Sequence, residues 1–309
     1  MNKLTSFQVS QAVSQAWSSQ SSSKWTEANP ARGQCGVTAI VVQELLGGDI
    51  YKTKLTDGWH YYNRIEQKRY DLSKSQFQIK LDYSDTPSSR EEAWTDTTEQ
   101  QYRSLKERTL VHLDTIKQGK ILFNGTPLLH TGRLLLRRFT HEDVSSVFAN
   151  WISDERVTDN RVNGAHKSIA ETEQRVATIL SSYQNEDFCY WAITLKGTGE
   201  LIGEIDLYDF GKMTSNCAVG YSIGFKWWSR GYCTEALKAV VSYGFEQMNV
   251  HKIEAAHNTD NLASGKVLKK AGMQQEGVVR DMIRNSKGQY KDCAIWGILQ
   301  TDYVGGGDK

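Results

Sequence analysis

A basic, glycine-containing turn in the last third of the chain has the composition of a phosphate-binding site. It reads Trp228-Ser229-Arg230-Gly231-Tyr232 and is expected to join a strand to a helix. Backbone N–H groups point out of a helix start, the helix dipole favours negative charge there, and the missing side chain of Gly231 lets an anion approach. An ordinary strand-to-helix connection can have the same residues, so this turn alone leaves both interpretations open.

A second set of residues, in the first third of the chain, could perform nucleophilic catalysis. Cys35 is expected to open a helix, with His60 and Asp71 on two strands that follow it. A helix start stabilises a thiolate, an imidazole can take the thiol proton, and a carboxylate can fix the imidazole tautomer. Gln34 could donate to an oxyanion. The alternative is a buried structural cysteine, a hydrogen-bonded histidine and a turn aspartate, because the sequence does not show whether the three groups meet.

Two carboxylates could serve as bases for a different reaction. Glu204 and Asp206 lie two residues apart on an expected strand, 201–208, so both side chains point to the same side of it. A carboxylate on one wall of a site can accept a proton from a substrate. The alternative for this pair is a solvated strand face.

The elements around the phosphate turn are predicted by hydrophobic periodicity. Short polar turns separate three expected strands, which favours an antiparallel meander. A helix with an apolar stripe and another strand follow, so the turn lies in a β-turn-α-β context. The expected strands are 189–195, 201–208 and 218–225, then the helix 234–248 and the strand 251–256.

The first part of the chain has its own alternation of helices and strands. We expect a helix within 4–20, a helix from Cys35 to a Gly47-Gly48 stop, and a helix at 105–116. Strands are expected at 49–53, 59–65 and 69–72. Glycine and proline punctuate the chain between 118 and 132, which predicts a boundary there. The expected domains are therefore 1–117, a linker 118–130, 131–302, and a flexible tail 303–309.

Composition limits the classes of partner and compartment. The 309 residues are 39% hydrophobic and 24% charged, with a formal net charge of +1, so we expect neither a nucleic-acid nor a membrane partner. No apolar run approaches the roughly 18 residues of a transmembrane helix. The five cysteines form no CxxC pair, and the polar N-terminus is not a signal peptide, so we expect a cytoplasmic protein without a metal site.

Several separated stretches carry a resemblance to a known family, in the family's order. They are 131–137, 221–237, 261–273 and 277–298. With these stretches, residues 131–300 strongly resemble a GNAT-fold, acetyl-CoA-dependent N-acetyltransferase, in the branch of ribosomal-protein alanine and spermidine acetyltransferases. The resemblance implies a mixed-sheet α/β domain that transfers acetyl to a primary amine of a protein N-terminus, a polyamine or a small molecule.

The resemblance also implies roles for individual residues. Backbone N–H groups of the turn surround the cofactor pyrophosphate, a strand end pairs with the pantetheine amides, and the asparagine of a following segment contacts the cofactor. Ser264 is the position for a proton donor to the departing thiolate. The implied acetyl-CoA-binding residues are Ile223, Gly224, Phe225, Arg230, Gly231, Tyr232, Cys233, Thr234, Asn261 and Ser264.

The sequence departs from the family at three positions. Ser229 stands where a second glycine is usual and Cys233 where an alanine is usual; both are small, so backbone approach should survive. Ala218 stands where many relatives have a glutamate that can act as base. Glu204 and Asp206 are therefore the candidates for deprotonating the amine.

The N-terminal pattern resembles another group of proteins. It runs from Asn29-Pro30 through Cys35 and His60 to Asp71 and is similar to the small YunG-like proteins and to transglutaminase-like, papain-related cysteine hydrolases. The expected fold is thus α+β with two domains, a small transglutaminase-like domain followed by a GNAT domain. The rival functions are a cysteine hydrolase or amidase with a regulatory, CoA-binding second domain, and a non-catalytic acyl-CoA-binding module. An oligomer is possible, and the sequence does not identify one.

Overall fold

The computed structural model describes residues 4–77, 79–159, 163–211, 213–285 and 287–303. The chain divides into two compact units, Met1–Leu122 and Phe123–Lys309. The division falls within the segment that we expected to be a linker. Each unit has its own sheet and its own hydrophobic core.

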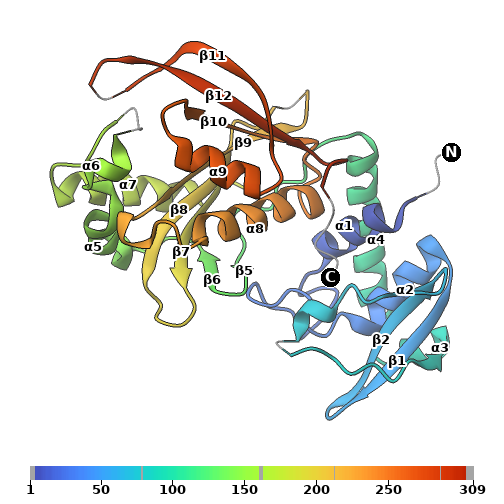
Figure 1. Ribbon diagram of the computed structural model, residues 1–309. Helices are drawn as coiled ribbons and strands as arrows, with labels where there is room; N and C mark the ends of the chain where they lie inside the picture. Colours follow the sequence, from blue (N-terminus) through green and yellow to red (C-terminus); the bar gives the residue numbers. More distant parts are fainter. Residues whose placement is uncertain (1–3, 78, 160–162, 212, 286, 304–309) are drawn as a thin grey trace. The chain divides into compact units, whose positions relative to one another are not determined.

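The first unit contains a layer of helices (Figure 1). Helix α1 ends at Ala16, short of the expected 4–20, and both α1 and α4 begin with a capping box, on Thr5 and Thr98. The core between α1, α2 and α4 includes Val13 and Leu105, both fully buried. The helices are α1 (Ser6–Ala16), α2 (Cys35–Leu46), α3 (Arg90–Trp94) and α4 (Glu99–Lys117).

The sheet of the first unit has the strand order β3-β2-β1-β4, and all of its pairs are antiparallel. Helix α2 packs on it, and the Asn63 side chain donates to the Ala39 carbonyl oxygen at 2.9 Å. Strand β4 was not expected, because it is short and contains Pro87, which is tolerated at a sheet edge. The strands are β1 (Asp49–Leu55), β2 (Gly58–Ile65), β3 (Lys68–Tyr70) and β4 (Thr86–Ser88).

The second unit is built on an eight-stranded mixed sheet, ordered β11-β12-β10-β9-β8-β7-β6-β5. The meander β7-β8-β9 is antiparallel as expected, and the β9–β10 pair is parallel. Strands β11 and β12 form a long hairpin at one edge (Figure 1). The strands are β5 (Leu129–His130), β6 (Leu134–Arg137), β7 (Cys189–Leu195), β8 (Leu201–Tyr208), β9 (Asn216–Ile223), β10 (Lys252–Asn258), β11 (Gln274–Arg284) and β12 (Tyr290–Leu299).

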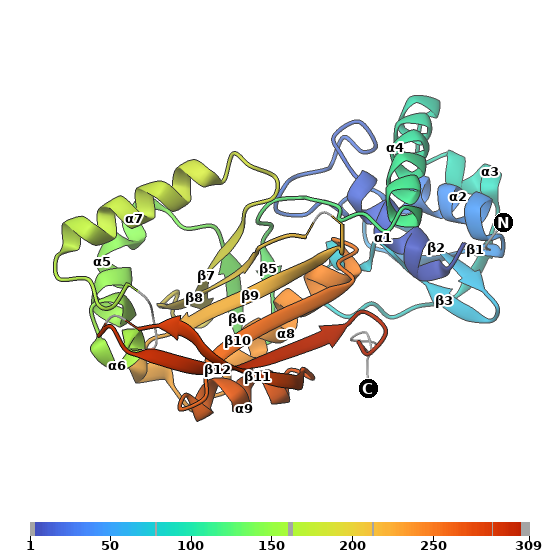
Figure 2. The same ribbon diagram turned by 90° about the horizontal axis from the view of Figure 1, so that it is seen from above.

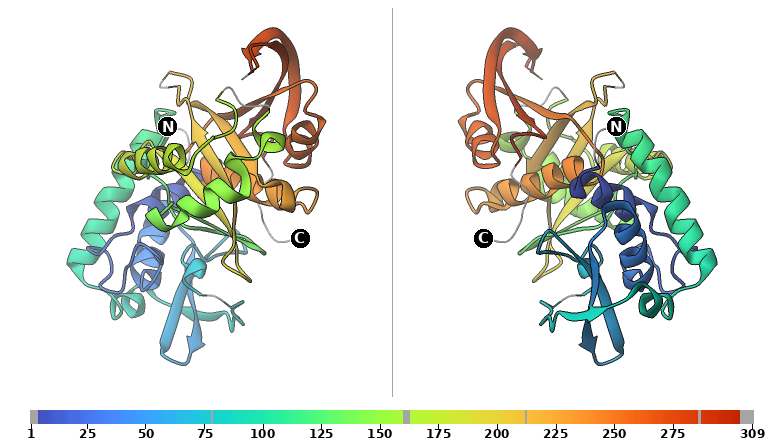
Figure 3. Two further views of the ribbon diagram at one scale, coloured as in Figure 1. Left: turned by 90° about the vertical axis from the view of Figure 1, so that its left-hand side faces the viewer. Right: turned by 90° about the vertical axis from the view of Figure 1, so that its right-hand side faces the viewer.

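Helices cover both faces of this sheet (Figures 2 and 3). Successive side chains of β7 show the two faces: Trp191 packs on Tyr243 of α8, while Ala192 packs with Trp151 and Val176 on the opposite side. The segment after β6 is divided into a 3₁₀ turn (His141–Asp143), α5 and a π-helical turn (Phe148–Ile152). The α-helices are α5 (Val144–Val147), α6 (Glu155–Thr158), α7 (Ile169–Ser182), α8 (Tyr232–Glu246) and α9 (Leu262–Lys270).

The segments expected to be a linker and a tail are partly packed. Gly125 donates to the Glu186 carbonyl oxygen at 2.7 Å, and Thr126 Oγ1 donates to the Phe188 carbonyl oxygen at 2.8 Å, so residues 125–130 belong to the second unit. Tyr303 donates to Glu246 Oε1 at 2.6 Å. The rest of the expected tail lies outside the described residues. None of the described helices combines the length and apolar character that crossing a bilayer requires.

Candidate functional site

The parallel strands β9 and β10 separate soon after they pair. Their ladder covers Lys252 with Asn216, Ile253 with Cys217 and Glu254 with Ala218, and then stops. Within the described residues, 219–223 of β9 and 255–258 of β10 have no ladder partner in each other. An extended ligand with amide groups can pair with such an exposed strand edge.

A cavity of about 300 Å³ lies where the strands diverge. One wall is β9, another is β10, and α9 and β8 complete it. Its lining includes Glu204, Asp206, Gly220, Tyr221, Asn261 and Ser264. The cavity therefore has carboxylates, hydroxyls and an amide in one space.

The phosphate turn follows β9 and ends at the start of α8. Gly231 is the N-cap of α8 with φ +80°, a left-handed conformation that glycine adopts without a steric cost. Ser229 also has a positive φ of 60°, which explains why a glycine is usual there in the resembling family. The first-turn amides of Tyr232, Cys233 and Thr234 lack intrahelical acceptors, as at any helix start, so they are available to an anion.

Arg133 supports this turn, and the sequence did not indicate it. Its guanidinium donates to the Arg230 carbonyl oxygen at 3.0 Å and to Glu235 at 2.7 Å, and it lies over the Tyr232 ring, 4.5 Å from its centroid. Arg133 stands at the start of the unit, almost a hundred residues before the turn, so no local pattern links the two. Two arginines, Arg133 and Arg230, are thus next to the α8 amides.

The strand end expected to pair with pantetheine is partly occupied by the protein itself. The Gly224 N–H donates to the Ile202 carbonyl oxygen at 2.9 Å, and the Trp228 indole donates to the Ile223 carbonyl oxygen at 2.6 Å. Phe225 begins a 3₁₀ turn and is exposed. The backbone that faces the cavity therefore lies further back, in residues 219–221.

The two carboxylates of β8 share the cavity wall but have different surroundings. Glu204 is 1% exposed, and Arg175 donates to both of its oxygens at 2.8 Å. It is therefore not part of a solvated strand face. Asp206 is half-buried and stands opposite Gly220, where an added Cβ would lie 2.8 Å from Asp206 Oδ1. The absence of a side chain at Gly220 thus gives the Asp206 carboxylate its space.

The remaining polar side chains of the cavity come from the start of α9 and from β9. Asn261 caps α9 by accepting from the Ser264 N–H at 3.3 Å. The Tyr221 hydroxyl donates to the Ser264 carbonyl oxygen at 3.3 Å, and burial raises the pKa of Tyr221, which keeps it protonated. Tyr221 is a second hydroxyl in the cavity, beside Ser264, that the sequence did not single out.

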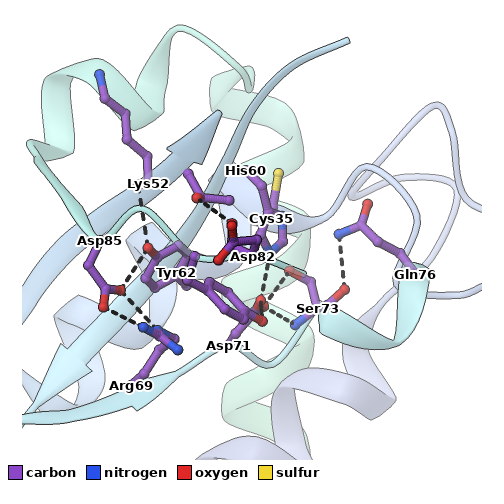
Figure 4. Close-up of polar contacts among 12 residues, drawn as sticks. Cys35, Lys52, His60, Tyr62, Arg69, Asp71, Ser73, Gln76, Asp82 and Asp85 are labelled. Atoms are coloured by element: carbon purple, nitrogen blue, oxygen red, sulfur yellow. Dashed lines mark hydrogen bonds and ion pairs between the residues drawn. The ribbon is translucent and has the colours of Figure 1, made fainter. Parts of the chain in front are cut away.

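The structure brings the Cys35, His60 and Asp71 set together in the first unit (Figure 4). His60 Nε2 lies 2.6 Å from Asp71 Oδ2, and both side chains are almost fully buried. Asp71 also accepts from the Tyr83 hydroxyl at 2.8 Å and from the Ser73 N–H at 3.1 Å. The carboxylate is thus held in one orientation, with an oxygen aimed at the imidazole.

The imidazole is electrostatically coupled to both neighbours. Burial lowers the pKa of His60, but the hydrogen bond to Asp71 and the interactions with Cys35 outweigh it and raise the pKa from about 6.5 to about 9. His60 Nδ1 is buried and has no hydrogen-bond partner of normal geometry among the described residues. Asp71 therefore holds Nε2, and Nδ1 is the ring nitrogen left for an interaction with Cys35.

Two further side chains define the cysteine end of this site. Cys35 begins α2, is 6% exposed, and its thiol lies 3.7 Å from Asp96 Oδ2, a contact that the sequence did not predict. Gly36 permits it, because an added Cβ would lie 3.2 Å from the Asp96 side chain. Gln34 is fully buried, and its amide donates to the Ser18 carbonyl oxygen at 3.4 Å. That bond occupies one amide proton of the residue expected to stabilise an oxyanion.

Comparisons with known proteins assign each unit separately. The YunG protein family matches residues 5–114, and the acetyltransferase (GNAT) domain family matches residues 133–274. Uncharacterized protein YunG of Bacillus subtilis is 48% identical over 110 residues, which is 36% of this chain and 96% of that protein. Uncharacterized N-acetyltransferase YoaA of the same organism is 33% identical over 174 residues, 56% of this chain and 97% of that protein.

A more distant relative and a solved structure agree with the second assignment. The [ribosomal protein uS5]-alanine N-acetyltransferase of Escherichia coli is 33% identical over 90 residues, 29% of this chain and 46% of that protein. The crystal structure of a GNAT-family acetyltransferase from Bacillus anthracis has 26% sequence identity and a TM-score of 0.50, and the match covers 56% of this chain and 99% of that one. The chain is therefore a member of the GNAT N-acetyltransferase family that carries a YunG domain in its first unit.

Proposed function

We propose that the second unit transfers an acetyl group from acetyl-CoA to a primary amine. The observation that carries this proposal is the divergence of β9 and β10 beside the phosphate turn, with Asp206 in the cavity between them. An elongated ligand with an anionic end and an amide-containing arm fits this arrangement. The N–H groups at the start of α8 can bind the anionic end, and the neighbouring edge of β9 can pair with the amides of the arm.

The residues of this chain that would hold the cofactor fall into two groups. The turn, with Arg230, Gly231 and the α8 amides of 232–234, would bind the pyrophosphate, with Arg133 as an additional cation. Residues 219–221 and Asn261 would contact the pantetheine arm. When bound, acetyl-CoA supplies an acetyl group on a thioester, which is activated toward amines.

The cavity side chains supply the proton transfers. A primary amine is mostly protonated at neutral pH and must lose a proton before it can attack. Asp206 is the proposed acceptor of that proton, directly or through a water molecule, because it is half-buried on the cavity wall. Glu204 is committed to Arg175 and has a positioning role. The Ser264 hydroxyl, or the protonated Tyr221 hydroxyl, would donate a proton to the leaving sulfur.

The acceptor is proposed to be cationic, because the Asp206 carboxylate lines the cavity and attracts an ammonium group, whereas Glu204 is paired with Arg175. A relative is named for acetylating an alanine of a ribosomal protein, so the N-terminal amine of a protein is the first candidate and a polyamine the second. All five cysteines are free, which suits the reducing cytoplasm where both acceptors occur.

A thiol-release assay tests the proposal. Purified protein and acetyl-CoA are incubated with alanine-initiated peptides, spermidine and small amines, and free CoA is measured over time. Release that depends on one amine class supports the transferase and identifies its acceptor. Calorimetric binding of acetyl-CoA without release by any amine would instead support the acyl-CoA-binding module, and no binding would exclude both.

A further inference from the structure

We propose that the first unit is a second, independent active site, in which Cys35 is the nucleophile that cleaves a linear amide. This activity goes beyond acetyl transfer and does not depend on it. Cys35, His60 and Asp71 are thereby interpreted as catalytic residues. The competing explanation is that they have a structural role.

The hydrogen-bond network argues for a reactive group. Asp71 is bound by groups of three residues: His60 and the Tyr83 hydroxyl contact Oδ2, and the Ser73 N–H donates to Oδ1. A histidine that serves only packing satisfies both of its nitrogens. His60 instead is 1% exposed and leaves Nδ1 without a partner of normal geometry among the described residues. Cys35 interacts with the same imidazole, and since Nε2 is bound to Asp71, Nδ1 is the nitrogen left for the thiol; Figure 4 shows His60 and Cys35 near one another.

The surroundings of Cys35 indicate how a substrate would arrive. Cys35 is 6% exposed, and its thiol contacts the carboxylate of the exposed residue Asp96, with Oδ2 at 3.7 Å. Only a slender group can reach a side chain that is so little exposed. The substrate therefore presents its carbonyl on an extended chain or as a small terminal amide. A folded surface would not reach the sulfur.

The chemistry balances with the residues present and one water molecule. In the reactive form the thiol proton lies on His60 Nδ1, and the Cys35 thiolate attacks the amide carbonyl carbon. The C–N bond breaks, Nδ1 gives its proton to the leaving nitrogen, and a thioester remains on Cys35. Water then gives a proton to Nδ1 and attacks the thioester, and the acid leaves as the thiolate forms again. The net reaction is amide plus water to carboxylic acid plus amine, with no change of oxidation state.

An amide is the favoured substrate because its leaving nitrogen needs a proton at the moment of cleavage. Asp71 stabilises the imidazolium that must supply that proton. The raised pKa of His60 supports the same conclusion, since the ring is largely protonated at neutral pH.

The test uses the full chain and two chemical probes. Iodoacetamide at pH 7 is followed by peptide mass spectrometry, which reports the alkylation rate of each cysteine. We expect Cys35 to react at least about tenfold faster than Cys217, which is also buried, because the neighbouring imidazole can accept the thiol proton. 4-Nitrophenyl acetate should leave an acetyl group on Cys35 that hydroxylamine removes, and acetyl-4-nitroanilide should be hydrolysed slowly.

Variants separate a reactive site from a structural one. His60→Gln should slow Cys35 alkylation about tenfold or more, and Cys35→Ala should abolish the acyl adduct and the anilide hydrolysis. Cys217→Ala is the matched control and should behave as wild type. Because the alkylation rates of Cys35 and Cys217 are compared within the wild-type protein, the test holds even if a variant unfolds. Cys35 reacting no faster than Cys217, or no acyl adduct on Cys35, would overturn the proposal.

Discussion

The carboxylates of the two candidate sites, Asp71 and Asp206, differ in their burial and in their hydrogen-bond partners. In the first unit, Asp71 is buried, bound by several donors and paired with a single imidazole. In the second unit, Asp206 is half-buried on the wall of a cavity, and the absence of a side chain at Gly220 makes room for its carboxylate. In the two proposed activities, the first arrangement would fix one path for the proton, and the second would leave room for a donor and an acceptor.

The two carboxylate environments suit the two proposed nucleophiles. In the first unit the nucleophile is the Cys35 side chain, and in the second it is the amine of the acceptor. A site that carries its own nucleophile needs a rigid partner network around that side chain, and it can be almost closed. A transferase site must admit a donor and an acceptor together, so it needs volume and unpaired backbone more than it needs a tight network. The diverging strands β9 and β10 supply the volume, and the α8 start supplies the amides.

The largest expected contrast is in stability. Asp71→Ala should lower the free energy of unfolding of the first unit by about 3–5 kcal/mol, because it leaves a buried imidazolium without its partner. Asp206→Ala, the matched variant, should change the second unit by about 1 kcal/mol or less, since the carboxylate is half-buried. Chemical denaturation of both variants, with the two unfolding transitions followed separately, measures this. Equal losses would mean that both carboxylates are structural.

The next effect depends on pH. The pKa of His60 in the folded protein is about 9, above its ordinary value near 6.5, so the stability it contributes is fully present below pH 6.5 and is lost as the pH rises through 9. The loss should be about 3 kcal/mol between pH 6 and pH 10. Denaturation of wild type and His60→Gln at several pH values gives the difference. If that difference is constant with pH, His60 is not protonated in the folded protein.

Asp206 should affect the rate of acetyl transfer and leave donor binding unchanged. Asp206→Asn is expected to lower kcat for amine acetylation about 100-fold, because the amide cannot accept the ammonium proton. Acetyl-CoA affinity should be unchanged, and activity should recover partly at high pH, where the amine is already deprotonated. Asp209→Asn makes the same charge change at an exposed position and is the control. Full activity of Asp206→Asn would show that Asp206 is not the base.

Donor binding should respond to charge at the turn. Arg230→Glu is expected to weaken acetyl-CoA binding about tenfold, since it reverses charge next to the α8 amides, and the effect should shrink at high salt. Arg280→Glu, on the exposed strand β11, is the matched reversal. Calorimetry on both variants decides the matter. Unchanged affinity in Arg230→Glu would remove the turn from the donor site.

The smallest effect concerns the backbone of the same turn. Ser229 has φ 60°, so Ser229→Gly should stabilise the second unit by about 0.5 kcal/mol by removing the left-handed strain. Ser229→Ala keeps the Cβ and should give no gain. Thermal denaturation of the pair tests this, and a gain in Ser229→Ala would assign the effect to the hydroxyl.

Much of the fold was predictable because periodicity is local. The meander strands β7 and β8 were predicted with their observed bounds, and helix α2 begins at Cys35 and ends at Leu46, before its Gly47-Gly48 stop. The elements that were not predicted are short or irregular, and they include β4, β5 and the π-helical turn Phe148–Ile152. Short edge strands form by pairing with distant residues, and that pairing has no local signature.

The sequence by itself determined which residue types are available at each site. It identified the glycine turn before α8, and it identified Cys35, His60 and Asp71 as a set. Helix starts, glycine positions and residue order are properties of a short stretch of chain. These features required no knowledge of what lies opposite them.

Tertiary structure alone decided which of these groups can act. Arg175 binds Glu204 and thereby leaves Asp206 as the proposed base, while Arg133 joins the phosphate turn and Asp96 contacts Cys35. Each contact joins residues that are far apart in the chain. Burial and partner charge set the protonation of a side chain, and both arise only when the chain is packed.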